Sequence, residues 1–225
     1  MRTTCLCIAF PALLLGVEGD KDKSESDSRP YTQTFLVDEK DFSSSGKNPF
    51  FSLEPGYVLV LETAGAPREA LTITVLAETK KVAGIETRVV EERETVDGKE
   101  KEVSRNFFAI CKRTNSVYYF GEDAGGAWLH GEKGAHFGMI MPGTPLLGAR
   151  YQQEIAPGVS MDRAEILSLS ETVETPAGKF TNCLKVLETN PVEPGAKEYK
   201  YYAPGVGLVQ EESLRLVKYG DKSKL

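Results

Sequence analysis

The stretch of sequence that decides the fold is GIETRVVEERETVDGKEKEVSRNFFAIC, residues 84–111. Two β-prone runs, 84–96 and 101–111, flank the dipeptide Asp97-Gly98. Both residues of an Asp-Gly pair tolerate the positive φ that a two-residue hairpin turn of type I′ requires. The stretch therefore predicts an antiparallel β-hairpin.

The segments on either side of this hairpin repeat its pattern. Upstream, residues 70–79 alternate apolar and polar side chains, with Leu71, Ile73 and Val75 on one face. Downstream, strand-like segments bounded by Pro and Gly cover residues 117–121, 150–155, 164–173, 179–188, 197–203 and 206–217. Such frequent turn signals, without a helical period, predict an all-β fold, an antiparallel meander of about ten strands in a barrel or half-barrel. One long irregular loop, residues 123–147, is expected to interrupt the meander.

The two ends of the chain differ in composition from its centre. An arginine, a short apolar run and a polar segment follow one another at the N-terminus, which is the layout of a secretory signal peptide. We therefore expect a signal peptide over residues 1–19, export to the periplasm or extracellular space, and no transmembrane segment after signal removal. Residues 20–47, rich in Asp, Lys and Ser, predict a disordered polar spacer. A single all-β domain should then occupy 48–218, with a tail over 219–225.

The composition limits the partners and the chemistry. Hydrophobic residues make up 40% of the chain and charged residues 27%, which is typical of a soluble globular protein. The net charge of −6 without basic clusters argues against a nucleic-acid partner. Neither a phosphate-binding loop nor a dinucleotide-binding fingerprint occurs, and we expect no cofactor.

Cys111 and Cys183 remain after signal removal and lie in predicted strands. In an exported protein two thiols can form one disulfide. The alternative is that they are two separate buried thiols that act as small apolar side chains. Their spacing does not decide between these two hypotheses.

The segment EYKYYAPGVGLVQEE, residues 198–212, predicts two strands joined at Pro204-Gly205. Alternation places Tyr199, Tyr201 and Ala203 on one face, and Lys200 and Tyr202 on the other. The first face is expected to be the buried one. Tyr201 then either packs in the core, or faces a ligand cavity together with two loop methionines.

Five segments resemble a family of exported bacterial proteins of unknown function: NPFFSLEPG, YYFGED, IMPGTPLLGARYQQEIAPGVSMDRAEI, TPAGKFTNCLKVLET and YKYYAPGVGLV. The likeness covers residues 48–212, and YYAPGVGLV near the C-terminus is its most recognisable motif. The chain departs from the family pattern in a shorter loop after Glu122-Asp123. The resemblance implies an all-β exported domain and brings no catalytic residues with it. More loosely, the alternation is similar to that of the half-barrels of lipoprotein carriers and of the lipocalins, which is an analogy of fold alone.

The irregular loop carries most of the candidate site residues. Trp128, Phe137, Met139 and Met141, with Tyr201 from the later strand, could line an apolar ligand pocket, because aromatic rings and methionines adapt to varied ligands. The same side chains could instead cap an open barrel end. The set His130, Glu132 and His136 combines imidazoles with a carboxylate, which zinc and copper accept, although two loop histidines are also often only solvated.

Three functions follow from these candidates. The sequence favours a non-catalytic exported domain that binds a small apolar ligand or lipid, or serves as an envelope scaffold. The alternative is a hydrolase that uses carboxylates near Glu122, Asp123 and Glu154. Metal binding through the histidine loop is a third hypothesis. The shape of the interior separates the first two, because a carrier needs an apolar cavity and an enzyme needs a polar cleft.

Overall fold

The computed structural model describes residues 29–124 and 127–224, and the predicted signal peptide lies outside them. The described residues form β-strands and two short 3₁₀ helices, and none of their helices is long and apolar enough to cross a bilayer. The elements are η1 (Glu39–Asp41), β1 (Phe42–Ser43), β2 (Lys47–Asn48), β3 (Phe51–Ser52), β4 (Tyr57–Glu62), β5 (Glu69–Val82), β6 (Ile85–Val96), β7 (Lys99–Cys111), β8 (Val117–Asp123), β9 (Trp128–Leu129), β10 (His136–Met141), β11 (Arg150–Gln152), β12 (Glu154–Ile155), β13 (Arg163–Thr175), β14 (Gly178–Thr189), β15 (Glu198–Ala203), β16 (Gly207–Glu211), β17 (Leu214–Asp221) and η2 (Lys222–Lys224).

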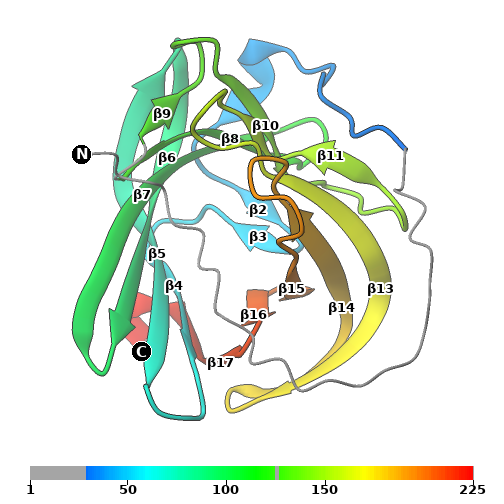
Figure 1. Cartoon of the computed structure of the whole chain (residues 1–225). Coiled ribbons are helices and arrows are strands. Elements are labelled where there is room, and N and C mark those ends of the chain that lie inside the picture. Colours follow the sequence, from blue (N-terminus) through cyan, green and yellow to red (C-terminus); the bar gives the residue numbers. More distant parts are fainter. Residues whose placement is uncertain (1–28, 125–126, 225) are drawn as a thin grey trace.

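Apart from the separate β2–β3 hairpin, the described strands form one antiparallel sheet that curls into a nearly closed barrel, in which β1 pairs only with β7 and β9 only with β8 (Figure 1). The order along the sheet is β11-β13-β14-β15-β16-β17-β4-β5-β6-β7-β8-β10-β12, which makes 13 strands instead of the expected ten or so. The predicted β6–β7 hairpin is confirmed, because Asp97 and Gly98 have φ of 50° and 74° and Val96 pairs with Lys99. The strand count was too low because short strands such as β11 and β12 show no alternation of their own.

The chain itself closes the barrel. β11 and β12 are the two ends of the sheet, yet they are consecutive in the sequence and only Gln153 separates them. We call the junction of β11 and β12 at Gln153 the seam. Gly138 on β10 lies against the seam, and a Cβ on Gly138 would come within 2.4 Å of the carbonyl carbon of Gln153. Glycine is therefore required at that position for β10 to pass the seam.

Alternation along the strands gives the barrel wall two apolar faces. In β7, Phe108 and Ile110 point into the barrel and join the main core, whereas Phe107 and Ala109 point outward into a second cluster. The outer cluster needs a cover, since exposed apolar patches of that size are uncommon on a monomer.

The segment before residue 48 supplies this cover, and it corrects the predicted domain boundary. Phe42 packs edge-on against Phe120 at a centroid distance of 5.1 Å, and Phe35 packs against Tyr118 at 5.5 Å. Thr32 forms a β-bridge with Tyr151 of β11. Residues 29–47 therefore belong to the folded domain and are not a disordered spacer. The polar composition of the predicted spacer as a whole concealed the packing role of its few aromatic residues, such as Phe35 and Phe42.

The β2–β3 hairpin lies in the barrel interior, between the walls formed by β5–β7 and β13–β14 (Figure 1). The Asn48 amide fixes it there, because Nδ2 donates to the backbone carbonyls of Asn115 and Pro142 at 2.8 and 3.0 Å. Leu53, just after the hairpin, is fully buried in the main core. The hairpin thus fills one part of the interior and leaves its Phe50 and Phe51 facing the remaining space.

The predicted faces of β15 were the wrong way round. Tyr202 is only 6% exposed and pairs with the buried Leu184 of β14. Tyr201 lies on the opposite face, where the Lys185 ammonium is 5.6 Å from its ring centre. The aromatic and apolar composition of the face of Tyr199, Tyr201 and Ala203 favours burial, but Lys200 shares the inner face with Tyr202.

Candidate binding cavity

A cavity of about 110 Å³ lies inside the barrel. Apolar side chains form most of its wall: Phe50, Phe51, Leu59, Ile73, Val75, Val90, Phe108, Ile140, Val206 and Leu208. Ser52, Tyr57, Tyr202 and Gly207 complete the wall apart from one charged side. The inward-facing positions of strands distant in sequence converge here because the sheet closes on itself.

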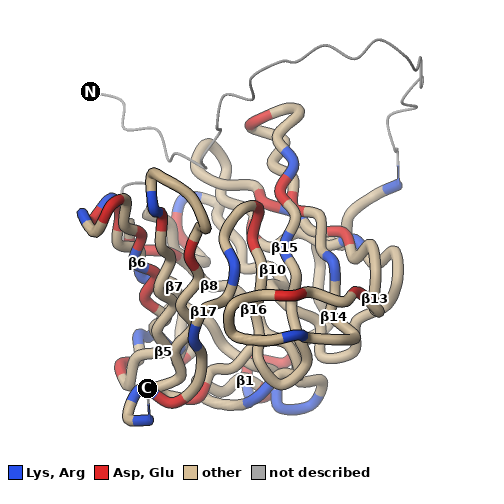
Figure 2. Tube along the Cα trace, turned by 90° about the horizontal axis from the view of Figure 1, so that it is seen from below, with Lys and Arg blue, Asp and Glu red and all other residues tan. Residues whose placement is uncertain are grey.

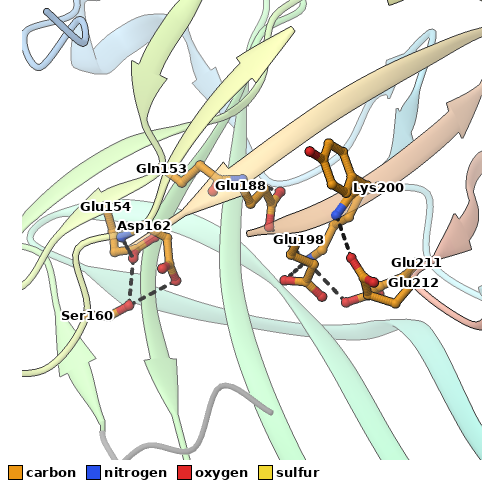
Figure 3. Close-up of polar contacts among 10 residues, drawn as sticks. Gln153, Glu154, Ser160, Asp162, Glu188, Glu198, Lys200, Glu211 and Glu212 are labelled. Atoms are coloured by element: carbon orange, nitrogen blue, oxygen red, sulfur yellow. Dashed lines mark hydrogen bonds and ion pairs between the residues drawn. The ribbon is translucent and has the colours of Figure 1, made fainter. Parts of the chain in front are cut away.

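The charged side of the cavity consists of Glu92, Glu188, Lys200 and Glu211. The Lys200 ammonium lies 2.9 Å from a carboxylate oxygen of Glu188, 3.3 Å from one of Glu211 and 3.8 Å from one of Glu198. Figure 3 shows these side chains projecting toward one another from neighbouring strands. We call Glu188, Glu198, Lys200 and Glu211 the lysine cluster.

The register of the sheet makes Lys200 necessary. Glu188 and Glu198 are directly opposite each other on β14 and β15, a like-charge pair that is unfavourable by itself. Burial lowers the pKa of Lys200, but the surrounding carboxylates outweigh burial and raise the pKa well above the ordinary lysine value. Lys200 also lowers the pKa of Glu198, but burial and Glu211 outweigh this effect and raise the pKa to about 7.

The fourth member of the charged side, Glu92, comes from β6, and Glu122 of β8 is close enough to affect its pKa. Burial raises the pKa of Glu92 to about 7; the Lys200 charge lowers this pKa, and the charge of Glu122 raises it further. Burial likewise raises the pKa of Glu122 to about 7, helped by Glu102 and Asp162. Among the residues that the structure describes, Glu92 has neither a hydrogen bond nor an ion pair. The interior is therefore acidic, and within the described residues the Glu92 carboxyl has no direct ion-pair partner.

The seam contributes a buried amide. The Gln153 side chain belongs to a residue that is only 2% exposed, and its Nε2 donates to Glu188 Oε1 at 2.7 Å (Figure 3). Its Oε1 has no partner in the described part of the chain. Exchanging the two amide atoms would place Oε1 against a carboxylate oxygen, so the hydrogen bond to Glu188 fixes the orientation. An acceptor is thus left open beside the lysine cluster.

A second group of acidic side chains, Glu154 and Asp162, lies near the lysine cluster. Glu154 is 1% exposed; its Oε1 accepts hydrogen bonds from the Ser160 hydroxyl at 2.7 Å and the Asp162 backbone N–H at 2.6 Å (Figure 3). Burial and the Asp162 charge raise the pKa of Glu154 well above its ordinary value. Burial and Glu188 raise the pKa of Asp162 as well. Because its carboxyl is enclosed by its own neighbours, Glu154 is not presented to the cavity.

Replacement of Glu92 by glutamine should stabilise the protein at pH 8 and have little effect at pH 5. The raised pKa means that folded Glu92 keeps its proton while unfolded Glu92 loses it above pH 4.5. The stability is therefore present below pH 4.5 and is lost as the pH rises through about 7. We expect a gain of about 1–3 kcal/mol at pH 8 from urea unfolding. The matched variant Glu91→Gln, on the outward face of the same strand, should show no such gain; equal effects would contradict the assignment.

The five residues predicted to bind a ligand do not come together. Trp128 packs on Tyr119 in a small third cluster, and Phe137 stacks on Phe120 at 4.9 Å in the outer cluster. Met139 contacts both large clusters and Met141 is buried in the main core. Of the described residues in the predicted loop, residues 123–147, Ile140 alone lines the cavity. The loop is not irregular throughout, because it contains strands β9 and β10.

The histidines and cysteines also have defined places. The rings of His130 and His136 are 6.0 Å apart, and His130 Nδ1 accepts a hydrogen bond from the Phe137 backbone N–H at 3.3 Å. In residues 29–124 and 127–224, no three His, Cys, Asp or Glu side chains are grouped so that they could hold a metal ion. Cys111 and Cys183 are free buried thiols, in the outer cluster and the main core respectively.

Sequence reasoning missed Glu92, Glu188, Lys200 and Glu211. The alternation of inward-facing and outward-facing residues along the strands could have revealed three of them. Glu188 continues the inward series of Leu184 and Val186, Glu92 continues that of Val90, and Lys200 precedes Tyr202 by two. A charged residue in register with buried ones marks a polar interior as readily as the solvent side.

The fold and cavity define an antiparallel β-barrel with an apolar interior that is acidic at one side. Comparison of the chain with family models, with curated proteins and with solved structures finds no match in any of the three. The resemblance to exported proteins drawn from the sequence therefore stays a prediction.

Proposed function

We propose that this protein is an exported, non-catalytic, lipocalin-like domain that binds a small amphipathic molecule inside its barrel. The observation that carries the proposal is the cavity, whose wall is apolar except for one charged side. An apolar cavity with a few convergent polar groups is the usual form of a ligand site. The apolar wall would take the body of the ligand, and the charged side would take its polar group.

The volume sets the size of the ligand. Engineered protein cavities of about 150 Å³ accept benzene. The 110 Å³ here therefore suits a single small ring or a short alkyl chain, and a long lipid would require the β2–β3 hairpin to move. The cavity volume therefore limits the expected lipid or apolar ligand to the smallest compounds of these classes.

The hydrolase alternative has less support. Glu122 faces the interior near Asp162, but Asp123 is exposed and Glu154 is enclosed by Ser160 and Asp162. The three carboxylates named for that alternative therefore do not converge on one open position.

A cavity-filling variant tests the proposed function. Ile73→Trp places an indole in the cavity, whereas Thr72→Trp places it on the outer face of the same strand. Benzyl alcohol and benzylamine are suitable probes, with binding measured by isothermal titration calorimetry. We expect at least one probe to bind the wild type and the Thr72→Trp variant, and to lose about tenfold or more in affinity for Ile73→Trp.

Two results would overturn this proposal. In the first, no small amphipathic probe binds the wild-type barrel. In the second, a probe binds Ile73→Trp as tightly as the wild type while circular dichroism shows that the variant is folded, because binding would then lie outside the cavity.

A further inference from the structure

The charge of the cavity wall is unbalanced. Its charged side chains are three glutamates, Glu92, Glu188 and Glu211, and one lysine, Lys200. Lys200 is engaged by Glu188 and Glu211 as well as by Glu198 outside the wall. The Glu92 carboxyl, which comes from β6, has no hydrogen bond or ion pair among the described residues, although the Lys200 charge acts on it. Any group that enters the polar side of this cavity meets a surplus of carboxylate.

A second observation, independent of charge, also concerns the polar side. Gln153 Oε1 is a buried acceptor without a donor, and its amide is fixed by the hydrogen bond from Nε2 to Glu188. Buried polar atoms in native proteins nearly always have a partner. The Tyr151 hydroxyl, also buried without a partner, lies close enough to Glu188 for that carboxylate to affect its pKa. The polar side therefore offers an open acceptor in Gln153 Oε1, whereas the Lys200 ammonium, a donor of this side, is already engaged by carboxylates.

We propose that the polar group of the ligand is a protonated amine. This inference rests on the proposed function and specifies the chemistry of its ligand. An ammonium group has three N–H donors and no acceptor, which matches two carboxylates and an amide oxygen. Glu92 and Glu188 line the cavity and would receive it, with Gln153 Oε1 as an open acceptor next to Glu188, while the apolar body lies against Phe51 and Val90.

The arrangement distinguishes an amine from other ligands. A carboxylate ligand would add a negative charge to a wall that already has too many, at a site where water does not screen the repulsion well. A bare metal ion needs ligands that converge on one point, and no such group of His, Cys, Asp or Glu occurs in the described residues. An organic ammonium needs only acceptors around its head and apolar surface around its body.

The test compares three probes that share one ring and differ in the attached group: benzylamine, benzyl alcohol and benzoate. Dissociation constants are measured on the intact wild-type protein by calorimetry at pH 8. We expect benzylamine to bind about tenfold more tightly than benzyl alcohol, because its hydrogen bonds are charge-assisted, and benzoate to bind most weakly.

Two single-site variants locate the effect. Glu92→Gln should remove much of the preference for benzylamine over benzyl alcohol. Glu91→Gln, one residue away on the outer face, should leave both unchanged. Glu92 has no ion pair to lose among the described residues, so Glu92→Gln should fold.

The outcomes separate this inference from the proposed function. If benzyl alcohol or benzoate binds as tightly as benzylamine and Ile73→Trp abolishes that binding, the cavity is a ligand site but the ligand is not an amine. If the preference for benzylamine is the same in Glu92→Gln and the wild type, the amine is bound elsewhere and the inference fails. If none of the three probes binds, the proposed function fails and this inference fails with it.

Discussion

Replacing Lys200 with methionine should be among the most damaging single substitutions in this protein at neutral pH. The change keeps the length of the side chain but leaves Glu188, Glu198 and Glu211 without the ammonium that lies between them. Removing one partner from a buried ion pair usually costs about 3–5 kcal/mol. The Lys200 side chain is 20% exposed, so solvent screens part of the repulsion and we expect a loss of about 2–4 kcal/mol.

The loss should depend on pH in a defined direction. Without Lys200 the carboxylates repel one another only when they are ionised. In the wild type Glu198 has a pKa of about 7 although Lys200 lowers it, so in the variant the Glu198 carboxyl should be protonated at pH 5. The deficit relative to wild type should therefore shrink at pH 5, which urea unfolding at both values can measure.

Two comparisons control for the loss of a cation as such. Lys185→Met removes an ammonium from the outer face of β14, where it lies 4.8 Å from the Tyr199 ring, and should cost about 1 kcal/mol or less. Adding Glu188→Gln to Lys200→Met should recover part of the lost stability, because one of the opposed carboxylates is removed. A Lys200→Met variant as stable as Lys185→Met at pH 7.5 would show that the lysine cluster does not stabilise the part of the barrel formed by β14, β15 and β16.

The fold was largely predictable because its signals are local. Asp97-Gly98 specifies its own turn, and alternation such as that of Leu71, Ile73 and Val75 needs no knowledge of other strands. The closure at Gln153 was not predictable in this way, because β11 and β12 are too short to alternate and pair with strands on opposite sides of the sheet. Residues 29–47 escaped detection for a related reason, since Phe35 and Phe42 contribute only once the outer face of β8 exists.

The candidate site was the least predictable part. Charges mark the solvent side of a strand in most proteins, and the prediction that the face of Tyr201 is buried left Lys200 on that side. Inside this barrel the carboxylates come from β6, β14 and β16 and the lysine from β15, so no single segment reveals that they meet. On the surface, in contrast, acidic and basic positions are interspersed along the tube, as at the tip of the β6–β7 hairpin (Figure 2).

The faces of β15 give the second large prediction. Tyr202→Ala should destabilise the protein by about 3–5 kcal/mol, the usual cost of truncating a large buried aromatic side chain. Tyr202 is 6% exposed, belongs to the main core and pairs with Leu184. Part of its ring lines the cavity, so the surroundings cannot simply collapse into the space that the ring leaves.

Tyr201→Ala is the matched control, because it removes the same side chain from the neighbouring position on the other face. Its ring contacts Lys185 and the edge of the core, and we expect a loss of about 1 kcal/mol. Urea unfolding of both variants at pH 7.5 measures the difference directly. Because the two substitutions differ only in the direction of the side chain, a Tyr201→Ala variant less stable than Tyr202→Ala would mean that β15 is turned over. Lys200 would then face solvent, and the charged side of the cavity would lose its only cation.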